Sequence, residues 1–168
     1  MIKPTLFIFS GLPATGKSTL AKLLAQYTGA MYIRIDTVEE KLAELCNIEV
    51  EDEGYCLSYR IASDNLRVGN SAVADSCNTI RITREAWESV AFESGANFYN
   101  IEVGCSDTEE HKSRVAKRNI EDKNSNCPTW EQIQLRQYEQ WGGGVVKIDT
   151  SGKTEAQSFS ELTEKLGL

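Results

Sequence analysis

The fold of this chain is decided by residues 5–18, which read TLFIFSGLPATGKS. The first six form a largely apolar run that is typical of a buried parallel strand. The last eight match the pattern G-x-x-x-x-G-K-[ST] in full. Residues 17–28 then carry leucines at helical spacing, and Gly29 follows where a C-terminal cap belongs. The stretch therefore predicts a strand, a glycine-rich loop and a helix in direct succession.

Phosphate chemistry explains the residue types in this loop. Gly11 and Gly16 permit backbone angles that let successive N–H groups wrap around phosphate oxygens, and the helix N-terminus adds its positive dipole. We expect Lys17 to bridge the β- and γ-phosphates and Ser18 to ligate Mg²⁺ through its hydroxyl. A purely structural strand–turn–helix is the alternative. The predicted ligands are ATP and Mg²⁺, and the predicted nucleotide-binding residues are Gly11, Leu12, Pro13, Ala14, Thr15, Gly16, Lys17, Ser18 and Thr19.

Four more apolar or alternating runs follow, at 31–36, 71–75, 98–103 and 145–149. Segments with helical spacing separate them: we expect helices from 36 or 37, over 55–68, from 82 to about 94, from 107 to about 119, from 129 to 141 and around 159–166. Strands separated by helices need crossover connections, and hence a parallel sheet covered on both faces. We predict a three-layer α/β sandwich around a five-stranded parallel sheet, as one domain, 1–168.

Composition narrows the class of protein. The chain has 168 residues, the length of one domain. Its 18 Lys and Arg against 25 Asp and Glu leave a net charge of −7, and an acidic surface repels nucleic-acid backbones and anionic lipids. Five cysteines without a C-x-x-C pair, with one histidine, indicate neither a zinc site nor a disulfide framework. We expect reduced, mostly buried thiols in a cytoplasmic protein.

Two aspartates end predicted strands, Asp36 the strand 31–36 and Asp75 the strand 71–75, at the carboxyl edge of the sheet, where α/β folds bind ligands. Asp36 is a candidate general base, because an acceptor alcohol must lose its proton as the phosphoryl group arrives. The alternative for Asp36 is a helix cap, completed by Glu39. Asp75 takes the place of a Walker-B acid, which holds Mg²⁺ through water or orients the acceptor. The alternative for Asp75 is a turn residue, and which aspartate is the base stays open.

Arg114 and Arg118 lie four residues apart, so both project from one face of a helix that runs into a polar loop at 119–128. This arrangement suits a lid, 107–128, that closes over ATP and neutralises the transferring phosphoryl charge. We also expect residues 119–128 to be among the most mobile without ligand. The alternative is an ion-paired outer face of the helix.

Other nucleotide-binding classes fit less well. A GTPase would need D-x-x-G after the third strand, but Asp75 is followed by Ser-Cys-Asn. Arg81 and Arg84 come next, and either one meets an anionic acceptor or a phosphate, or both are solvated surface residues. We expect a small phosphotransferase that moves the γ-phosphate of ATP to a hydroxyl of a small molecule. A nucleic-acid 5′-OH or nucleotide-sugar kinase, and a nucleotide-binding regulator with little turnover, are the alternatives.

The order of these features resembles the P-loop small-molecule kinases related to chloramphenicol phosphotransferase, zeta toxin, gluconate kinase, adenylyl-sulfate kinase and polynucleotide kinase. The residues that carry the resemblance are Gly11–Ser18, Asp36, Val73-Ala74-Asp75 with Arg81 and Arg84, Arg114 with Arg118, and Asp149-Thr150. The resemblance implies a sheet in the order 2-3-1-4-5 and a helical insertion on the acceptor side, 37–69.

The same resemblance implies roles for single residues. Lys17 and Ser18 would bind phosphate and Mg²⁺, Asp36 would be the base, and Asp75 would support the metal or the acceptor. Arg114 and Arg118 would belong to the lid, and the segment after Thr150 would flank the adenine. One departure concerns the acceptor. Polynucleotide kinases carry an arginine three residues after the base, and Glu39 at this position argues against a polynucleotide acceptor.

Overall fold

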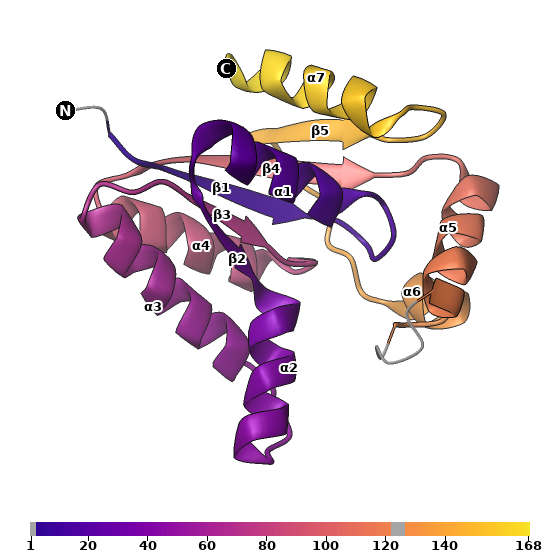
Figure 1. Ribbon diagram of the computed structural model, residues 1–168, viewed down its shortest axis with the longest axis horizontal. Helices are drawn as coiled ribbons and strands as arrows, with labels where there is room; N and C mark the ends of the chain where they lie inside the picture. The colour runs from indigo at the N-terminus through magenta and orange to yellow at the C-terminus, as the bar shows by residue number, and fades with distance from the viewer. Residues whose placement is uncertain (1–2, 122–126) are drawn as a thin grey trace.

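The structure, a computed structural model, describes residues 3–121 and 127–168. Figure 1 shows the alternation of strands and helices, which runs β1 (Thr5–Ser10), α1 (Lys17–Thr28), β2 (Met31–Arg34), α2 (Ile35–Cys46), α3 (Glu53–Arg67), β3 (Ala72–Asp75), α4 (Arg81–Glu93), β4 (Asn97–Gly104), α5 (Thr108–Glu121), α6 (Trp130–Leu135), β5 (Val145–Asp149) and α7 (Glu155–Leu166). None of the helices in these two ranges is long and apolar enough to cross a membrane.

The five strands form one parallel sheet in the order β2-β3-β1-β4-β5, as predicted. The central strand β1 is apolar toward both faces, because Leu6 and Ile8 point to one side while Phe7 and Phe9 point to the other. Leu6 and Ile8 pack with residues of α3 and α4, and Phe7 and Phe9 pack with residues of α1 and α7. The sheet lies between these two helix layers (Figure 1), which confirms the three-layer α/β sandwich.

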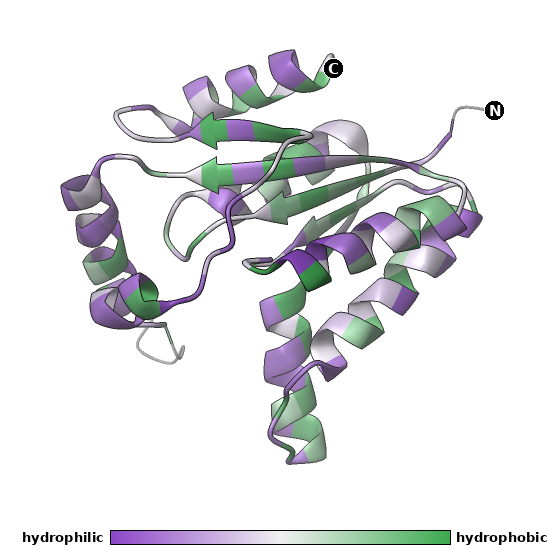
Figure 2. Ribbon diagram, turned by 180° about the vertical axis from the view of Figure 1, so that it is seen from behind, coloured by the Kyte–Doolittle hydropathy of each residue, from purple (hydrophilic) through white to green (hydrophobic). Residues whose placement is uncertain are grey.

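Helix α5 differs from the helices that cover the sheet. Only His111 and Val115 of this helix are buried. Figure 2 shows α5 as largely hydrophilic, whereas the strands carry many hydrophobic residues. Because it has little apolar surface to bury, α5 stands beyond the carboxyl edge of the sheet instead of lying on a face.

The predicted strand 31–36 is too long. β2 ends at Arg34, and α2 begins at Ile35, whose side chain is buried in the core beneath the first helical turn. Arg34 is the N-cap residue and no side chain caps this helix, so the capping box of Asp36 and Glu39 is wrong. Asp36 lies instead in the first turn of α2, where the helix dipole favours a carboxylate.

The predicted helix 129–141 is also too long. Its capping box at Thr129 and Gln132 forms as expected, but α6 ends at Leu135. The next residues run in an extended path because tertiary contacts hold them: the Glu139 N–H donates to the Thr79 carbonyl over 2.8 Å, and Trp141 packs on a guanidinium from α4. These contacts outweigh the local helical pattern.

The predicted insertion, 37–69, contains most of α2 and all of α3. The two helices approach closely at Gly54, where a Cβ would lie 2.2 Å from Cγ of Glu39. Two of the five cysteines, Cys46 and Cys56, are exposed on these helices, and the other three are half-buried. Among the described residues no two of the five are joined by a disulfide, but the expectation that most are buried is wrong.

We predict that Trp87→Ala destabilises the protein by about 3–5 kcal/mol, because it leaves a large cavity between α4 and the sheet. Trp87 is 0% exposed, and its ring meets the edge of Tyr59 with a centroid distance of 4.5 Å. The matched control is Phe92→Ala on the same helix, where the side chain is 83% exposed. Urea unfolding monitored by circular dichroism measures both variants. Similar losses in the two variants would contradict this assignment of the core.

Candidate active site

The glycine-rich loop joins β1 to α1 at the carboxyl edge of the sheet. Gly11 has a φ of 145°, and a Cβ there would lie 2.3 Å from the carbonyl oxygen of Val103, so only glycine fits. Ala14 and Gly16 also have positive φ, and for Ala14 this conformation costs about 1–2 kcal/mol. In the part of the chain that the structure describes, the N–H groups of Ala14 and Gly16 donate to no backbone carbonyl. The curved loop thus leaves backbone donors available, a feature that binds anions.

A buried ion pair holds the loop to the neighbouring strand. Nζ of Lys17 lies 2.5 Å from Oδ1 of Asp75, at the end of β3, and the two residues are 6% and 1% exposed. The Tyr32 hydroxyl, from β2, donates to Oδ2 of Asp75 over 2.6 Å. Burial alone would raise the pKa of Asp75, but the Lys17 ammonium and hydrogen bonds from Lys17, Tyr32 and Ser18 hold it below its ordinary value. Burial and the Asp75 carboxylate raise the pKa of Tyr32.

Asp36 and Lys17 both line a cavity beside the loop. The Asp36 side chain is half exposed, and its Oδ2 lies 3.4 Å from Nη2 of Arg34. Glu39, one turn further along α2, lines the same cavity. Burial and the nearby Asp36 carboxylate raise the pKa of Glu39, while Arg136 opposes the shift. The cavity lining therefore combines a half-exposed carboxylate at Asp36 with a partly buried one at Glu39.

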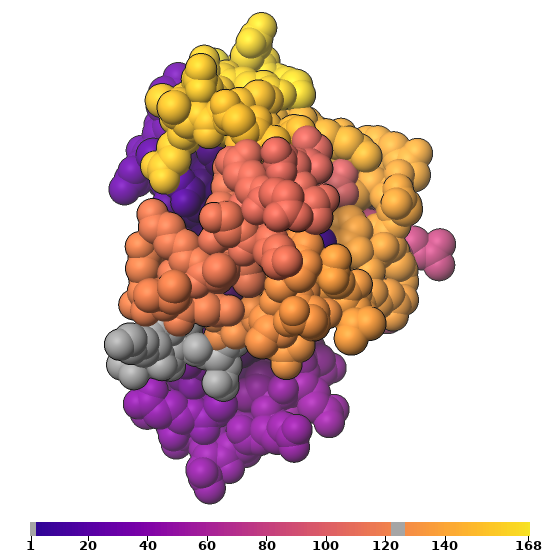
Figure 3. Space-filling view, turned by 90° about the vertical axis from the view of Figure 1, so that its right-hand side faces the viewer, coloured from indigo at the N-terminus to yellow at the C-terminus, as the bar shows by residue number. Residues whose placement is uncertain are grey.

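The two α5 arginines occupy different surroundings. Nη2 of Arg114 lies 2.6 Å from Oε1 of Glu110, and Nη1 donates to Oγ1 of Thr150 over 2.7 Å. Arg118 also lines the cavity, and within residues 3–121 and 127–168 it has no ion-pair partner. Figure 3 looks onto α5 and α6, with α2 below them. The predicted lid, 107–128, and the expected mobility of 119–128 extend over residues 122–126, which lie outside the described residues.

Arg84 does not reach the cavity, so its predicted contact with an anionic ligand is wrong. It is 3% exposed, donates to the carbonyls of Asn78 and Thr79, and lies 4.1 Å from the ring centroid of Trp141. Arg84 therefore fixes the chain that returns from α6 against the loop after β3. Arg81 is exposed and forms an ion pair with Glu85 on the surface.

Arg136 belongs to the site but was not predicted from the sequence. It follows α6 and lines the cavity near Glu39 and Cys77. Arg136 was not recognised because it lies within the predicted helix 129–141, and an arginine in the middle of a surface helix does not indicate a ligand site. Burial raises the pKa of the neighbouring Cys77 thiol, so this cysteine stays protonated.

One cavity of about 1130 Å³ connects these groups. Its lining includes Lys17, Ser18 and the two α5 arginines, and also the carboxylates of Asp36 and Glu39. The volume exceeds the usual 300–1,000 Å³ of a single small-molecule pocket, so it has room for two ligands side by side. The cations in the lining favour a polyanion, and Asp36 lines the same space.

The donor set beside the loop suits Mg²⁺. The Ser18 hydroxyl lies next to the Asp75 carboxylate, and these hard oxygen donors are the kind that Mg²⁺ prefers. Among the described residues no group of three or more His, Cys, Asp or Glu side chains gathers around a common point. A magnesium ion here would therefore complete its shell with water and ligand phosphates, as it usually does in sites of this kind.

Fold and loop together define a P-loop domain of the kinase type. Residues 6–139 match the AAA domain family, so the chain belongs to this family. No curated protein matches the sequence. The chain is similar to the Mycobacterium tuberculosis APS kinase CysC, solved with AMPPNP and APS, with 13% identity over 100% of both chains and a TM-score of 0.75.

Two further solved structures have the same fold. A gluconokinase from Sinorhizobium meliloti shares 17% identity over 99% of this chain and 98% of that chain, with a TM-score of 0.67. Kti12 from Chaetomium thermophilum, solved with ADP-AlF3, shares 20% identity over 96% of this chain and 97% of that chain, with a TM-score of 0.69. At these identities the likeness shows the P-loop kinase-like fold.

We predict that Asp75→Asn lowers the free energy of unfolding at pH 7 by about 3 kcal/mol, since it leaves the buried Lys17 ammonium without its partner. The contribution of a carboxylate whose folded pKa is lowered is complete above its unfolded pKa of about 4 and is lost as the pH falls through the folded pKa. The difference between wild type and variant therefore narrows below pH 4.

Urea unfolding at pH 7 and pH 3 tests this expectation. Asp64→Asn is the matched control, because Asp64 is 57% exposed and pairs with Arg60 on the surface, where such pairs contribute about 0–1 kcal/mol. An Asp75→Asn variant as stable as Asp64→Asn at pH 7 would contradict the stabilising role of the ion pair.

Proposed function

We propose that this protein is a phosphotransferase that moves the γ-phosphoryl group of ATP to a hydroxyl of a small molecule. The observation that carries the proposal is the shared cavity: residues of the phosphate loop and Asp36 line the same space. A nucleotide-binding switch needs the loop but has no use for a carboxylate placed beside the terminal phosphate. A kinase needs both, because the acceptor must be deprotonated next to the phosphoryl group.

We assign nucleotide binding to the phosphate loop and to Asp75, which pairs with Lys17 of the loop. Backbone N–H groups of residues 14–19 would hold the α- and β-phosphates, because Pro13 has no N–H and the Gly11 N–H already donates to the Cys77 carbonyl. Lys17 would leave Asp75 to meet the β- and γ-phosphates. Ser18, directly, and Asp75, through water, would hold Mg²⁺, which neutralises charge on the phosphate oxygens when bound. Separation of the Lys17–Asp75 pair thus supplies one cation for phosphate and one carboxylate for the metal shell.

The acceptor end is assigned to Asp36. As a carboxylate in the first turn of α2, it can accept a proton from an alcohol held above the γ-phosphate. Asp75 is the less suitable base, because Tyr32 already donates to one of its carboxylate oxygens and the proposed magnesium shell would engage the other. Residues 37–69 would shape the acceptor pocket, where a carboxylate at Glu39 disfavours a phosphorylated or polyanionic acceptor.

We assign the neutralisation of charge on the transferring phosphoryl group to the arginines of the lid region, 107–128. Arg118 is the better placed of the two predicted arginines, because Arg114 is already occupied by Glu110 and Thr150. The net charge of −7 makes nucleic acid an unsuitable partner and suits a small acceptor in a cytoplasmic setting.

We expect Asp36→Asn to fold, to bind MgATP within about threefold of wild type, and to lose about 10²–10⁴-fold in phosphoryl transfer, the usual contribution of a general base. Lys17→Ala should lose both nucleotide affinity and transfer, since Lys17 touches the phosphates. An acceptor is first found by incubation with ATP and pooled alcohols, with mass-spectrometric detection of a product heavier by one HPO₃ unit. Calorimetry and turnover are then measured on the same preparations.

Asp64→Asn is the control for the Asp36 substitution, because Asp64 is an exposed aspartate on α3 outside the cavity-lining residues. Transfer by Asp36→Asn within a few-fold of this control would exclude Asp36 as the base and leave Asp75. ATP binding without transfer to any pooled acceptor would favour the nucleotide-binding regulator.

A further inference from the structure

Thr150, the first residue after β5, lies at the centre of a hydrogen-bond network beneath the phosphate loop. Its side chain is 4% exposed. The hydroxyl donates to the Thr15 carbonyl over 2.7 Å, with the Gly104 carbonyl a second acceptor at 3.1 Å. Its Cγ2 methyl lies 3.5 Å from the position that a Cβ of Gly16 would take. Thr150 therefore contacts the peptide that links Thr15 to Gly16.

That peptide is important for phosphate binding. A trans peptide is planar, so its C=O and N–H point in opposite directions. With the Thr15 carbonyl fixed toward Thr150, the Gly16 N–H points away from Thr150. Within the described ranges this N–H donates to no backbone carbonyl, and it stays available to a phosphate oxygen. Because Gly16 has a positive φ and no side chain, the orientation of this peptide depends on such outside contacts.

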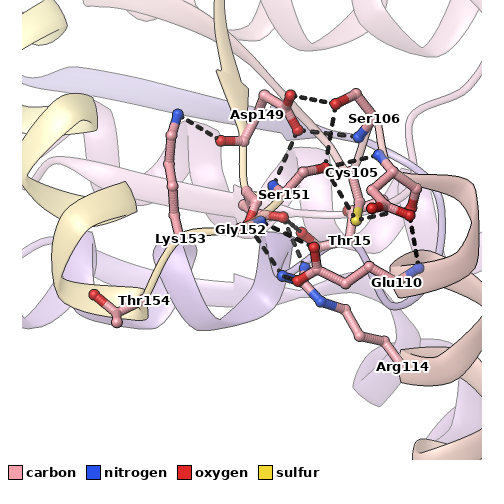
Figure 4. A network of polar contacts seen from close by, with 12 residues as sticks. Thr15, Cys105, Ser106, Glu110, Arg114, Asp149, Ser151, Gly152, Lys153 and Thr154 are labelled. Carbon is pink, nitrogen blue, oxygen red and sulfur yellow. Dashed lines mark hydrogen bonds and ion pairs between the residues drawn. The ribbon is translucent and has the colours of Figure 1, made fainter.

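Arg114 holds Thr150 in turn. Its Nη1 donates to Oγ1 of Thr150, and its Nη2 donates over 3.0 Å to the Thr150 carbonyl oxygen. A hydroxyl that accepts from a guanidinium is polarised and becomes a stronger donor toward its own acceptor. Figure 4 shows Thr15, Glu110 and Arg114 converging in this network.

Glu110 balances the charge of Arg114. Its Oε1 accepts from Arg114 and its Oε2 accepts from the Gly152 N–H over 2.9 Å. The guanidinium is therefore both neutralised and tied to the loop after β5. One turn of α5 away, Nε2 of His111 donates to the Pro13 carbonyl over 2.8 Å, so α5 holds the phosphate loop at two points.

We propose that Thr150 and Arg114 are positioning residues, which act on the nucleotide through the Thr15–Gly16 peptide and not by touching its γ-phosphate. This inference rests on the proposed nucleotide binding but goes beyond it, because it gives the two α5 arginines different roles. An arginine that contacts the γ-phosphate directly affects the binding of ATP but not that of ADP. Residues that act through the Thr15–Gly16 peptide, which we call the relay, affect the phosphates that ADP and ATP share.

Calorimetric titration with MgADP and with MgAMPPNP separates these roles. We expect Thr150→Val to weaken both ligands by about tenfold, since the Thr15 carbonyl loses its donor. Arg114→Gln should weaken both ligands by equal factors. The double variant should bind about as well as Thr150→Val alone, because the two residues act in one chain of contacts. Thr150→Ser, which keeps the hydroxyl, should stay within about threefold of wild type.

The controls make the test independent of folding. Lys117→Gln removes an exposed cation from the same helix and should leave both affinities unchanged. Arg114→Gln keeps the buried Thr150 hydroxyl in place, so it tests the relay even if Thr150→Val does not fold. Circular dichroism melting curves show that each variant is folded at the titration temperature.

Three results would contradict this role of Thr150 and Arg114. The first is that Arg114→Gln weakens the binding of MgAMPPNP but not that of MgADP. The second is that the losses of affinity caused by the two substitutions add in the double variant, and the third is that both single variants bind like wild type. A wild-type protein that binds neither ligand would instead refute the proposed function, and the relay with it.

Discussion

The ion pair between Lys17 and Asp75 is the interaction on which this site depends. It joins the phosphate loop, which follows β1, to the end of β3, the neighbouring strand of the sheet. In a buried place neither charge is tolerated without the other, so the pair fixes the start of α1 relative to the sheet. The same two groups are the ones that a nucleotide and a magnesium ion would need. The stabilising contact in the free protein and the binding groups of the proposed complex are therefore the same atoms.

The parallel sheet explains why chemically useful groups from distant parts of the sequence meet. The phosphate loop, Asp36 and Thr150 follow the carboxyl ends of strands, and Asp75 is the last residue of β3. In a parallel sheet these ends lie at one edge. The polar helix α5 crosses this edge without covering it and contributes both arginines. The polar network of Thr150 then links the loop after β5 to the loop after β1, on the side of β1 away from Asp75.

Much of this architecture could be predicted from the sequence, because strands and helices alternate with clear periodicity and the loop motif is specific. The sheet order came from the family resemblance, and the match to the AAA domain family and the observed order agree with it. Predictions that used local pattern alone failed where tertiary contacts dominate. One example is α6, which ends at Leu135 because the following segment is held by contacts such as that of Trp141 with Arg84. Another is α2, which begins at Ile35, earlier than predicted, with the Ile35 side chain buried in the core. The place of Arg136, and the contacts of Thr150 with the loop, depend on such contacts and give no local signal.

Residues 11–18 are the proposed binding site for the phosphates of a nucleoside triphosphate. Calorimetric titration of the wild-type protein with MgATP and with adenosine tests this proposal most directly. Because the loop offers backbone donors and cations to phosphate and nothing comparable to the nucleoside, MgATP should bind at least about a hundredfold more tightly, the equivalent of about 2.7 kcal/mol. Equal affinity for the two ligands, or no binding of MgATP, would contradict the account.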